Sequence, residues 1–228
     1  MLSPLIVALD LDLKDALILV DKLDPRDCRL KVGSQLFTAN GPEVIGVLKD
    51  RGFEIFLDLK FHDIPNTVSK ALTSSIKHGV WMINVHASGG KKMLEAASLA
   101  VSEAKLKPIL VGVTLLTSLD RVATREIGFK LNLEEQVIKL ARLCKEKGLD
   151  GVVCSPKEIT LLREEMGNDF LLVCPGIRSC SASNDQRRTA SPASALKDGA
   201  NYIVLGREVT LDKNPSKKLK HILESISY

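Results

Sequence analysis

Charged side chains alternate in sign along the first three apolar segments of the sequence. Asp10 ends the first segment, Lys31 lies in the second, and Asp58 and Lys60 stand two residues apart at the end of the third. Residues two apart on a strand share a face, and paired strands lie about 4.8 Å apart, so the four charges could contact one another. Burying several ions is costly unless their geometry is excellent. We therefore expect a functional site, with a purely structural salt-bridge layer as the alternative.

Three more polar residues follow the third and fourth apolar segments. Asp63 stands just before Pro65, at a predicted helix start, where an aspartate commonly caps the helix. His62 and His86 lie at strand ends, where a histidine more often supports its neighbours through hydrogen bonds than acts in catalysis. A structural interpretation is therefore open for all three.

Glycine and arginine occur together twice in the last quarter of the chain. The runs are PGIR at residues 175–178 and GR at residues 206–207. Glycine lets the backbone approach a ligand closely, and the planar guanidinium group of arginine matches phosphate oxygens. Barrels often bind phosphate with the loops after strands seven and eight, so these runs indicate a phosphorylated substrate.

Eight short apolar segments, rich in Val, Ile and Leu, alternate with helix-period stretches. The segments are residues 5–10, 28–33, 53–60, 80–86, 108–114, 149–155, 170–175 and 200–206. Eight strand-then-helix units without a break in composition predict an α/β fold, a (β/α)8 TIM barrel formed by residues 1–228 as a single domain. The rival is an open doubly wound sheet, which usually has a Gly-rich turn after its first strand, whereas residues 9–12 contain no glycine.

The composition limits the class of protein. The chain has 228 residues, 45% of them hydrophobic, and a formal net charge of +4, which argues against low-complexity disorder and against nucleic acid as a partner. The apolar N-terminal segment lacks a basic leader, and no stretch approaches the ~18 apolar residues of a membrane span. Five cysteines without CxxC spacing indicate neither a disulfide framework nor a zinc site. We expect a soluble cytoplasmic protein that binds no membrane.

The run DLKFHDIPNTV at residues 58–68 resembles the signature of the orotidine 5′-monophosphate decarboxylase family. Further similar blocks are residues 8–10, 31–33, 84–90, 113–118, 175–178, 185–188 and 206–207. The DxKxxD core is shared with related sugar-phosphate barrels, but the longer match is highly specific and is similar to the bacterial-type, single-function members. The resemblance implies a carboxy-lyase that converts orotidine 5′-monophosphate to UMP and CO₂, the last step of de novo pyrimidine nucleotide synthesis, without cofactor or metal.

The resemblance also implies roles for the four alternating charges. Lys60 would be the general acid that protonates C6 of the pyrimidine as CO₂ leaves. Asp58 would lie beside the departing carboxylate and hold the charged network together. Lys31 and Asp10 would meet the ribose hydroxyls.

The remaining family positions imply a shared site. Asp63 and Thr67 would reach the ribose in the neighbouring subunit's site, which makes the active unit a homodimer. Thr117 and Gln186 would lie near the pyrimidine. The phosphate and its closing loop, residues 179–184, would be contacted by Arg178, Gly206 and Arg207.

Two positions depart from the commonest family pattern. Ser179 and Glu208 stand where the family often has proline, each directly after one of the arginines. An acidic side chain beside a phosphate-binding arginine would be unfavourable if it pointed at the phosphate. We therefore expect Glu208 to point outward.

Two other functions compete with the decarboxylase. A metal-dependent sugar-phosphate decarboxylase or hexulose-phosphate synthase on a similar barrel would use the carboxylates as oxygen ligands for Mg²⁺. A non-catalytic binder of phosphorylated ligands would have no need of a proton donor, so the presence of both Asp58 and Lys60 argues against it. Sensitivity to a chelator separates the metal-dependent alternative from the decarboxylase.

Overall fold

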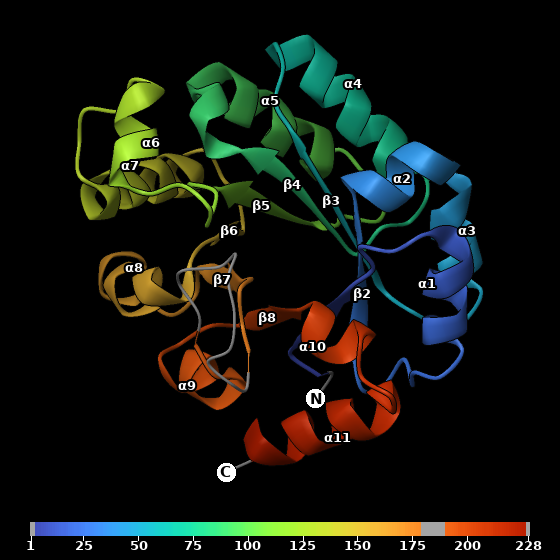
Figure 1. Cartoon of the computed structure of the whole chain (residues 1–228). Coiled ribbons are helices and arrows are strands. Elements are labelled where there is room, and N and C mark those ends of the chain that lie inside the picture. The colour runs from blue at the N-terminus through green and yellow to red at the C-terminus, as the bar shows by residue number, and fades with distance from the viewer. Residues whose placement is uncertain (1–2, 179–189, 227–228) are drawn as a thin grey trace.

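Eight parallel strands close into a barrel in the computed structural model, which describes residues 3–178 and 190–226. Each strand pairs with the next along the chain, and β8 pairs with β1 (Figure 1). The strands are β1 (Leu5–Ala8), β2 (Arg29–Gly33), β3 (Ile55–Phe61), β4 (Met82–His86), β5 (Ile109–Val113), β6 (Gly151–Val153), β7 (Leu171–Cys174) and β8 (Tyr202–Leu205). The predicted (β/α)8 TIM barrel is confirmed.

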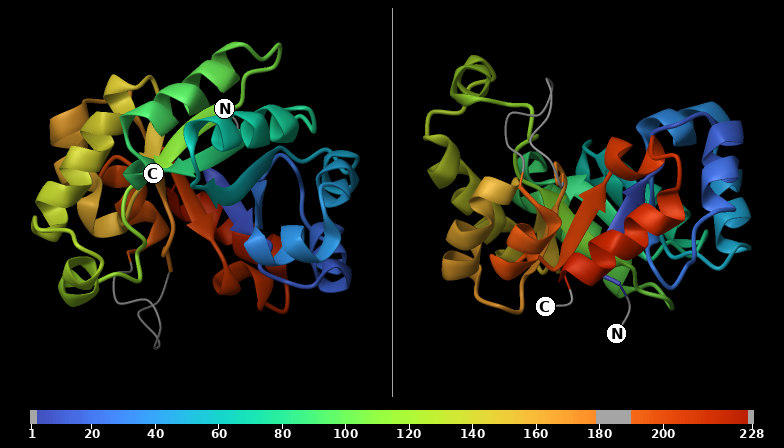
Figure 2. Two further views of the ribbon diagram at one scale, coloured as in Figure 1. Left: turned by 90° about the horizontal axis from the view of Figure 1, so that it is seen from above. Right: turned by 60° about the horizontal axis from the view of Figure 1, so that its bottom comes forward.

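Helices follow every strand and lie around the outside of the barrel (Figures 1 and 2). The α-helices are α1 (Leu13–Val20), α2 (Ser34–Asn40), α3 (Glu43–Lys49), α4 (Pro65–Ile76), α5 (Lys91–Ser102), α6 (Arg121–Glu126), α7 (Leu133–Glu146), α8 (Ile159–Met166), α9 (Pro192–Lys197), α10 (Arg207–Thr210) and α11 (Pro215–Ile226). Two 3₁₀ helices, η1 (Ala87–Gly89) and η2 (Pro156–Glu158), follow β4 and β6. Within the described ranges, no helix has the length and apolar character needed to cross a membrane.

The strands are shorter than the apolar segments that predict them. Segment 149–155 contains only the three residues of β6, and Asp10 lies beyond β1 rather than at its end. The apolar residues outside the strands are still buried, as Leu9 and Leu149 show with exposures of 0% and 4%. Residues just beyond the strand ends are also buried under the helices and are therefore apolar. The apolar segments of the sequence are longer than the strands for this reason.

Strand residues alternate between the barrel interior and the layer between strands and helices. The interior cluster consists of Ile6, Ala8, Phe56, Met82, Val111, Val173 and Val204. Phe56 has the same parity as Asp58 and Lys60, and the partner of Ala8 across the β1–β2 ladder is Lys31. The inward-facing positions therefore change from apolar to charged towards the carboxyl ends of the strands.

An aromatic and charged cluster closes the opposite, amino-terminal end of the barrel. The guanidinium carbon of Arg29 lies 4.1 Å from the ring centroid of Trp81, and the Trp81 and Tyr202 rings meet edge to face at 5.1 Å. Arg29 also donates to the Ser3 carbonyl at 2.5 Å and to Glu54 at 2.8 Å. This end is filled and paired, so the open mouth lies at the carboxyl ends of the strands.

The helix ends differ in how they are capped. Gly148, with φ of 76°, follows the C-cap of α7, and Asn214 Oδ1 accepts the Lys217 N–H at 3.1 Å at the start of α11. Asp12 occupies the N-cap position of α1, but its side chain makes no capping hydrogen bond.

Candidate active site

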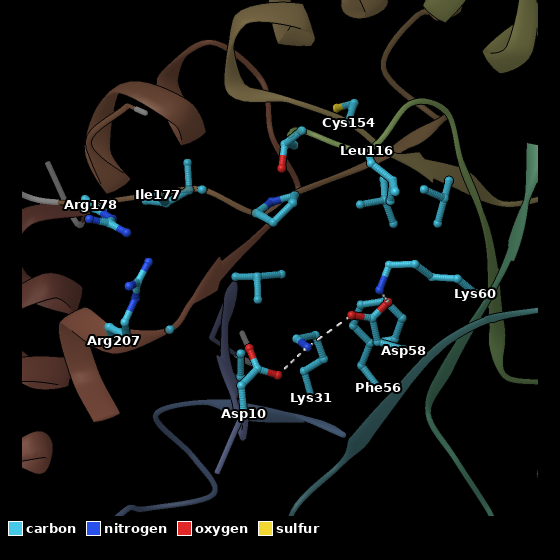
Figure 3. Close-up of a pocket in the computed structure, with 18 of the residues that line it drawn as sticks. Asp10, Lys31, Phe56, Asp58, Lys60, Leu116, Cys154, Ile177, Arg178 and Arg207 are labelled. Carbon is cyan, nitrogen blue, oxygen red and sulfur yellow. Dashed lines mark hydrogen bonds and ion pairs between the residues drawn. The ribbon is translucent and has the colours of Figure 1, made fainter. Parts of the chain in front are cut away.

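A cavity of about 460 Å³ opens at the carboxyl-terminal mouth of the barrel (Figure 3). Eight of the candidate site residues line it: Asp10, Lys31, Asp58, Lys60, Thr117, Arg178, Gly206 and Arg207. Asp63 and Thr67 do not line it, and Gln186 lies outside the described residues, as does the predicted closing loop. The order of the strands explains why these residues meet. The charged residues lie on or just after the neighbouring strands β1, β2 and β3, and the arginines follow β7 and β8, of which β8 pairs with β1.

The four alternating charges form a continuous chain of ion pairs. Lys31 Nζ lies 3.1 Å from Asp10 Oδ1 and 3.1 Å from Asp58 Oδ2, and Lys60 Nζ lies 2.7 Å from Asp58 Oδ1 (Figure 3). The Lys31 and Asp58 side chains are about one-tenth exposed, Lys60 is one-third exposed and Asp10 is 59% exposed. The chain of charges thus runs from the rim of the cavity at Asp10 into its floor.

Charge pairing keeps the two buried members of this chain ionised. Burial disfavours the charged form of Lys31, but the carboxylates of Asp58 and Asp10 outweigh it and raise the pKa of Lys31. Burial likewise disfavours the ionised form of Asp58, yet Lys31 and Lys60 outweigh it and hold the pKa of Asp58 below its usual value. Near neutral pH the floor of the cavity therefore carries fixed charges of both signs.

Lys60 stands at an irregularity of the sheet. The β3–β4 register pairs Leu57 with Ile83 but Phe61 with Val85, so the strand bulges between these pairs. Lys60 has a φ of 53°, a left-handed conformation that costs an L-residue about 1–2 kcal/mol. Among the non-glycine residues that the structure describes, it alone has a positive φ. Such strain at a cavity wall is typical of functional positions.

Asn84, for which the sequence motifs predict no individual role, holds this bulge. Its Oδ1 accepts the backbone N–H of Lys60 at 2.8 Å, and its Nδ2 donates to Asp58 Oδ1 at 2.7 Å. The side chain is completely buried on β4. An amide between the apolar residues Ile83 and Val85 of a predicted strand was the signal in the sequence, since a buried amide requires hydrogen-bond partners.

Much of the cavity lining around the charges is apolar. This apolar wall is formed by Phe56, Val113, Leu115, Leu116, Val153 and Ile177, and Leu116 lies above Lys60 in Figure 3. Apolar surroundings exclude water and strengthen the electrostatic interactions of the nearby ammonium group. The cavity therefore combines a charged floor with an apolar wall.

Arg178 and Arg207 lie together at the end of the cavity opposite Lys60 (Figure 3). The backbone N–H of Arg178 donates to the Ala190 carbonyl at 2.9 Å, and Arg207 begins α10 directly after β8. Glu208, which also borders the cavity, lies 3.0 Å from Lys218 of α11 through its carboxylate. The Glu208 carboxylate thus pairs with α11 while the residue still borders the cavity.

Asp63, Ile64 and Thr67 are exposed at the start of α4, outside the cavity of their own chain. Asp63 Oδ1 accepts the Ile64 N–H at 2.6 Å, and Ile64 rather than Asp63 is the N-cap of α4. Helix capping therefore does not account for Asp63.

His62 and His86, at the ends of β3 and β4, lie near each other with ring centroids 5.4 Å apart. Burial, then the neighbouring His62 and Lys60, lower the pKa of His86. His86 is therefore neutral near pH 7, which suits a supporting role.

Cys154 borders the cavity but lacks the character of a nucleophile. Its Sγ lies 3.5 Å from Cys174 Sγ, and both thiols are completely buried. The hydrogen bond with Cys174, followed by burial, raises the pKa of Cys154 well above its usual value. A thiol that stays protonated is a poor nucleophile and a poor metal ligand. Within the described part of the chain, no group of three or more His, Cys, Asp or Glu side chains is arranged to hold a metal ion.

Comparison with known proteins identifies the family. Residues 3–222 match the family described as orotidine 5′-phosphate decarboxylase / HUMPS. The chain is 50% identical over 225 residues to a Vibrio campbellii protein named orotidine 5′-phosphate decarboxylase, with 97% of each chain covered. A relative of the same name from Neisseria meningitidis is 50% identical over 223 residues, covering 96% of this chain and 91% of the relative.

A solved structure shares the fold over the full length. The orotidine 5′-phosphate decarboxylase of Lactobacillus acidophilus superposes with a TM-score of 0.89 at 39% identity, covering 99% of this chain and 100% of the other. A Geobacillus kaustophilus protein described only as uncharacterized and conserved superposes with a TM-score of 0.85 at 35% identity, covering 98% and 100%. The chain therefore belongs to the orotidine 5′-phosphate decarboxylase / HUMPS family.

Proposed function

We propose that this protein decarboxylates orotidine 5′-monophosphate to UMP and CO₂, the last step of de novo pyrimidine nucleotide synthesis. The observation that carries the proposal is the ion-pair chain from Asp10 to Lys60 at one end of a cavity whose other end holds Arg178 and Arg207. A nucleoside monophosphate fits this arrangement, because its phosphate can bind at the arginine end of the cavity while its planar base lies at the other end. The full-length relatives named for this activity support the same conclusion.

Lys60 acts as the general acid in this proposal. When the bond between C6 and the carboxylate breaks, the electron pair stays on C6, where no ring carbonyl is placed to accept it. A fixed ammonium group beside C6 stabilises this charge and then transfers a proton from Nζ to C6. Lys60 is left neutral and regains a proton from solvent. The positive charge comes from the protein itself, so the reaction as proposed needs no cofactor.

Asp58 holds Lys60 in place and lies beside the substrate carboxylate. Its two oxygens contact Lys60 and Lys31, so it fixes both ammonium groups at once. Lys31 and Asp10, nearer the rim, bind the ribose hydroxyls. Repulsion between Asp58 and the substrate carboxylate would be relieved when CO₂ departs.

The phosphate group binds at the other end of the cavity. Arg178 and Arg207 supply guanidinium groups, and Gly206 allows the backbone to come close. Thr117 borders the cavity next to the apolar wall, a position suited to the pyrimidine, and Gln186 is assigned to the same group by family resemblance. Binding energy from the remote phosphate can be used to organise the reacting end.

The proposed enzyme is a homodimer in which each active site is shared between the two subunits. We place it in the cytoplasm. Asp63 and Thr67 are exposed and lie outside their own cavity, as expected of residues that serve the neighbouring subunit's site. Their contact with the ribose is assigned by family resemblance. The proposed active unit is therefore the dimer.

The metal-dependent alternative is disfavoured by the charges on the floor of the cavity. Both oxygens of Asp58 already contact ammonium groups, and Asn84 donates to one of them as well. Lys31 lies between Asp58 and Asp10, where a divalent ion bridging the two carboxylates would have to bind. A cation at this position would be repelled by the Lys31 ammonium group.

The proposed function is tested by mixing the purified protein with orotidine 5′-monophosphate in the presence of EDTA and following the loss of ultraviolet absorbance. Turnover that is unaffected by the chelator is expected. No turnover would overturn the proposal, and turnover that requires added Mg²⁺ would favour the metal-dependent alternative.

A further inference from the structure

Asn84 is a buried polar side chain to which the proposed mechanism assigns no role. It lies in the middle of β4, is 0% exposed, and uses both ends of its amide. One end accepts the Lys60 backbone N–H and the other donates to the Asp58 carboxylate. A single side chain thus contacts the backbone of the proposed proton donor and the side chain of its partner.

The position of Asn84 matches the irregularity in the sheet. Between the paired positions Leu57–Ile83 and Phe61–Val85, β3 contains three residues and β4 contains only Asn84. The extra residues of β3 lose regular ladder partners, and a buried N–H without an acceptor is costly. The side-chain Oδ1 of Asn84 provides the acceptor for the Lys60 backbone N–H and so supports the left-handed conformation of Lys60.

We propose that Asn84 is a positioning residue that joins Asp58 and Lys60 into one rigid unit and sets the direction of the Lys60 ammonium group. The inference deepens the proposed function and rests on it. A primary amide suits this task because it presents an acceptor and a donor at fixed separation, whereas a carboxylate can only accept and an alanine can do neither. Asn84 does not line the cavity, so it acts only through its two partners.

The surroundings of Asn84 define what a charge at this position would meet. Asp58 and Lys60 face it from β3, with Lys31 beyond Asp58, and His86 lies on its own strand near the same charges. The β5 neighbours are apolar: Val111 is its partner in the ladder, and Val113 follows two residues later. A carboxylate at position 84 would therefore lie against Asp58 itself.

Asn84→Ala is the first test. Loss of both hydrogen bonds releases Lys60 and Asp58, and kcat is expected to fall on the order of 100-fold, as for a small misplacement of a reacting group. The inhibition constant for UMP is expected to change by less than about threefold, because the phosphate contacts lie at the other end of the cavity and Lys31 keeps its ion pair with Asp10. A general loss of folding would weaken UMP binding and kcat together.

Asn84→Asp supplies a pH-dependent rescue. The introduced carboxyl group would contact Asp58, and two carboxylates in contact raise the pKa at which the pair loses its last proton. Below that pKa the protonated side chain can still donate to Asp58 and accept from Lys60, so activity is retained. Above it, the ratio of kcat for Asn84→Asp to kcat for wild type is expected to fall by up to about tenfold per pH unit. Titration of His86 or of the lysines affects both proteins and cancels in this ratio.

Asn201→Ala and Asn201→Asp are the matched controls. Asn201 Oδ1 accepts the Leu172 N–H at 2.8 Å and Arg163 Nη2 at 2.9 Å, at the opposite end of the barrel. Asn201→Ala is expected to lower the melting temperature, because it removes the acceptor for both partners, whereas the carboxylate of Asn201→Asp can still accept from both. Both variants are expected to leave kcat and its pH profile unchanged.

The outcomes separate this inference from the proposed function. If wild type turns over orotidine 5′-monophosphate and Asn84→Ala does so equally fast, or if the Asn84→Asp ratio is independent of pH, the positioning role is overturned and the proposed function stands. If wild type itself fails to turn over, the proposed function is overturned, and the inference with it.

Discussion

The Nζ atom of Lys60 lies 2.7 Å from Oδ1 of Asp58, although the two residues belong to the same strand. In a regular strand their Cα atoms would stand roughly 7 Å apart with parallel side chains. The left-handed backbone of Lys60 and the bulge beside it change the direction in which this side chain leaves the strand. Asp58 and Lys60 thus form their ion pair within an irregular strand, and the pair places an ammonium group next to a carboxylate at the cavity floor.

Lys60→Ala is expected to lower kcat by about 1000-fold or more, since it removes both the fixed charge and the proton donor. The measurement is single-turnover decay of orotidine 5′-monophosphate absorbance, with the circular dichroism spectrum as the check on folding. Lys70→Ala, an exposed lysine on α4, is the control and should behave as wild type. Near-wild-type turnover of Lys60→Ala would remove Lys60 from the acid role.

Asp58→Asn is expected to reduce stability in a pH-dependent way. The pKa of Asp58 is lowered in the folded protein, so its ionised form stabilises the fold above the pKa of the unfolded chain. That contribution disappears as pH falls through the folded-state pKa, when wild-type Asp58 also becomes neutral. Near pH 7 the variant should lose about 3 kcal/mol of unfolding free energy, the typical cost of removing one partner of a buried ion pair.

The measurement for Asp58→Asn is urea unfolding of both proteins between pH 3 and pH 7. The difference in unfolding free energy should shrink on the acid side, below about pH 4, which is the ordinary range for an aspartate. A difference that stays constant across this range would show that the Asp58 charge does not contribute as described.

Much of this site follows from strand order and parity. The segments around Asp10, Lys31 and Asp58 are neighbours in a barrel, and inward-facing positions alternate, so their contact could be expected before any coordinates. The role of Asn84 could not be predicted from the sequence, because it depends on a two-residue shift in the β3–β4 register that the hydrophobic periodicity does not reveal. The cluster of Arg29, Trp81 and Tyr202 at the amino-terminal end of the barrel was also not predicted, because its residues are far apart in the sequence.

Arg207→Ala is expected to lower kcat/KM by about 100-fold for orotidine 5′-monophosphate through loss of a guanidinium–phosphate contact. The informative comparison uses orotidine, the same nucleoside without its phosphate. Wild type and variant should process orotidine at the same slow rate, because neither can use the missing group. An equal loss on both substrates would show that Arg207 supports the cavity rather than binds phosphate.

Mixed dimers test the proposed sharing of sites. Asp63→Ala and Lys60→Ala chains are each expected to be nearly inactive, for different reasons. In a mixed dimer one site carries both defects and the other carries none, so an equal mixture that exchanges subunits should recover about one quarter of wild-type activity. The check is activity after joint unfolding and refolding of the two chains. A mixture that remains inactive, with mixed dimers present by native mass spectrometry, would place Asp63 in its own subunit's site.

The filled end of the barrel should affect stability without affecting chemistry. Arg29→Lys keeps the positive charge but removes the planar group that stacks on Trp81 and also contacts Ser3 and Glu54. The unfolding free energy should fall by about 1–3 kcal/mol from lost stacking and hydrogen bonding, while kcat stays at the wild-type value. Arg26→Lys is the control, because the Arg26 side chain is 86% exposed and pairs only locally with Asp24, so its unfolding curve should match wild type. A fall in kcat for Arg29→Lys at full folding would mean that the two ends of the barrel are coupled through the interior cluster.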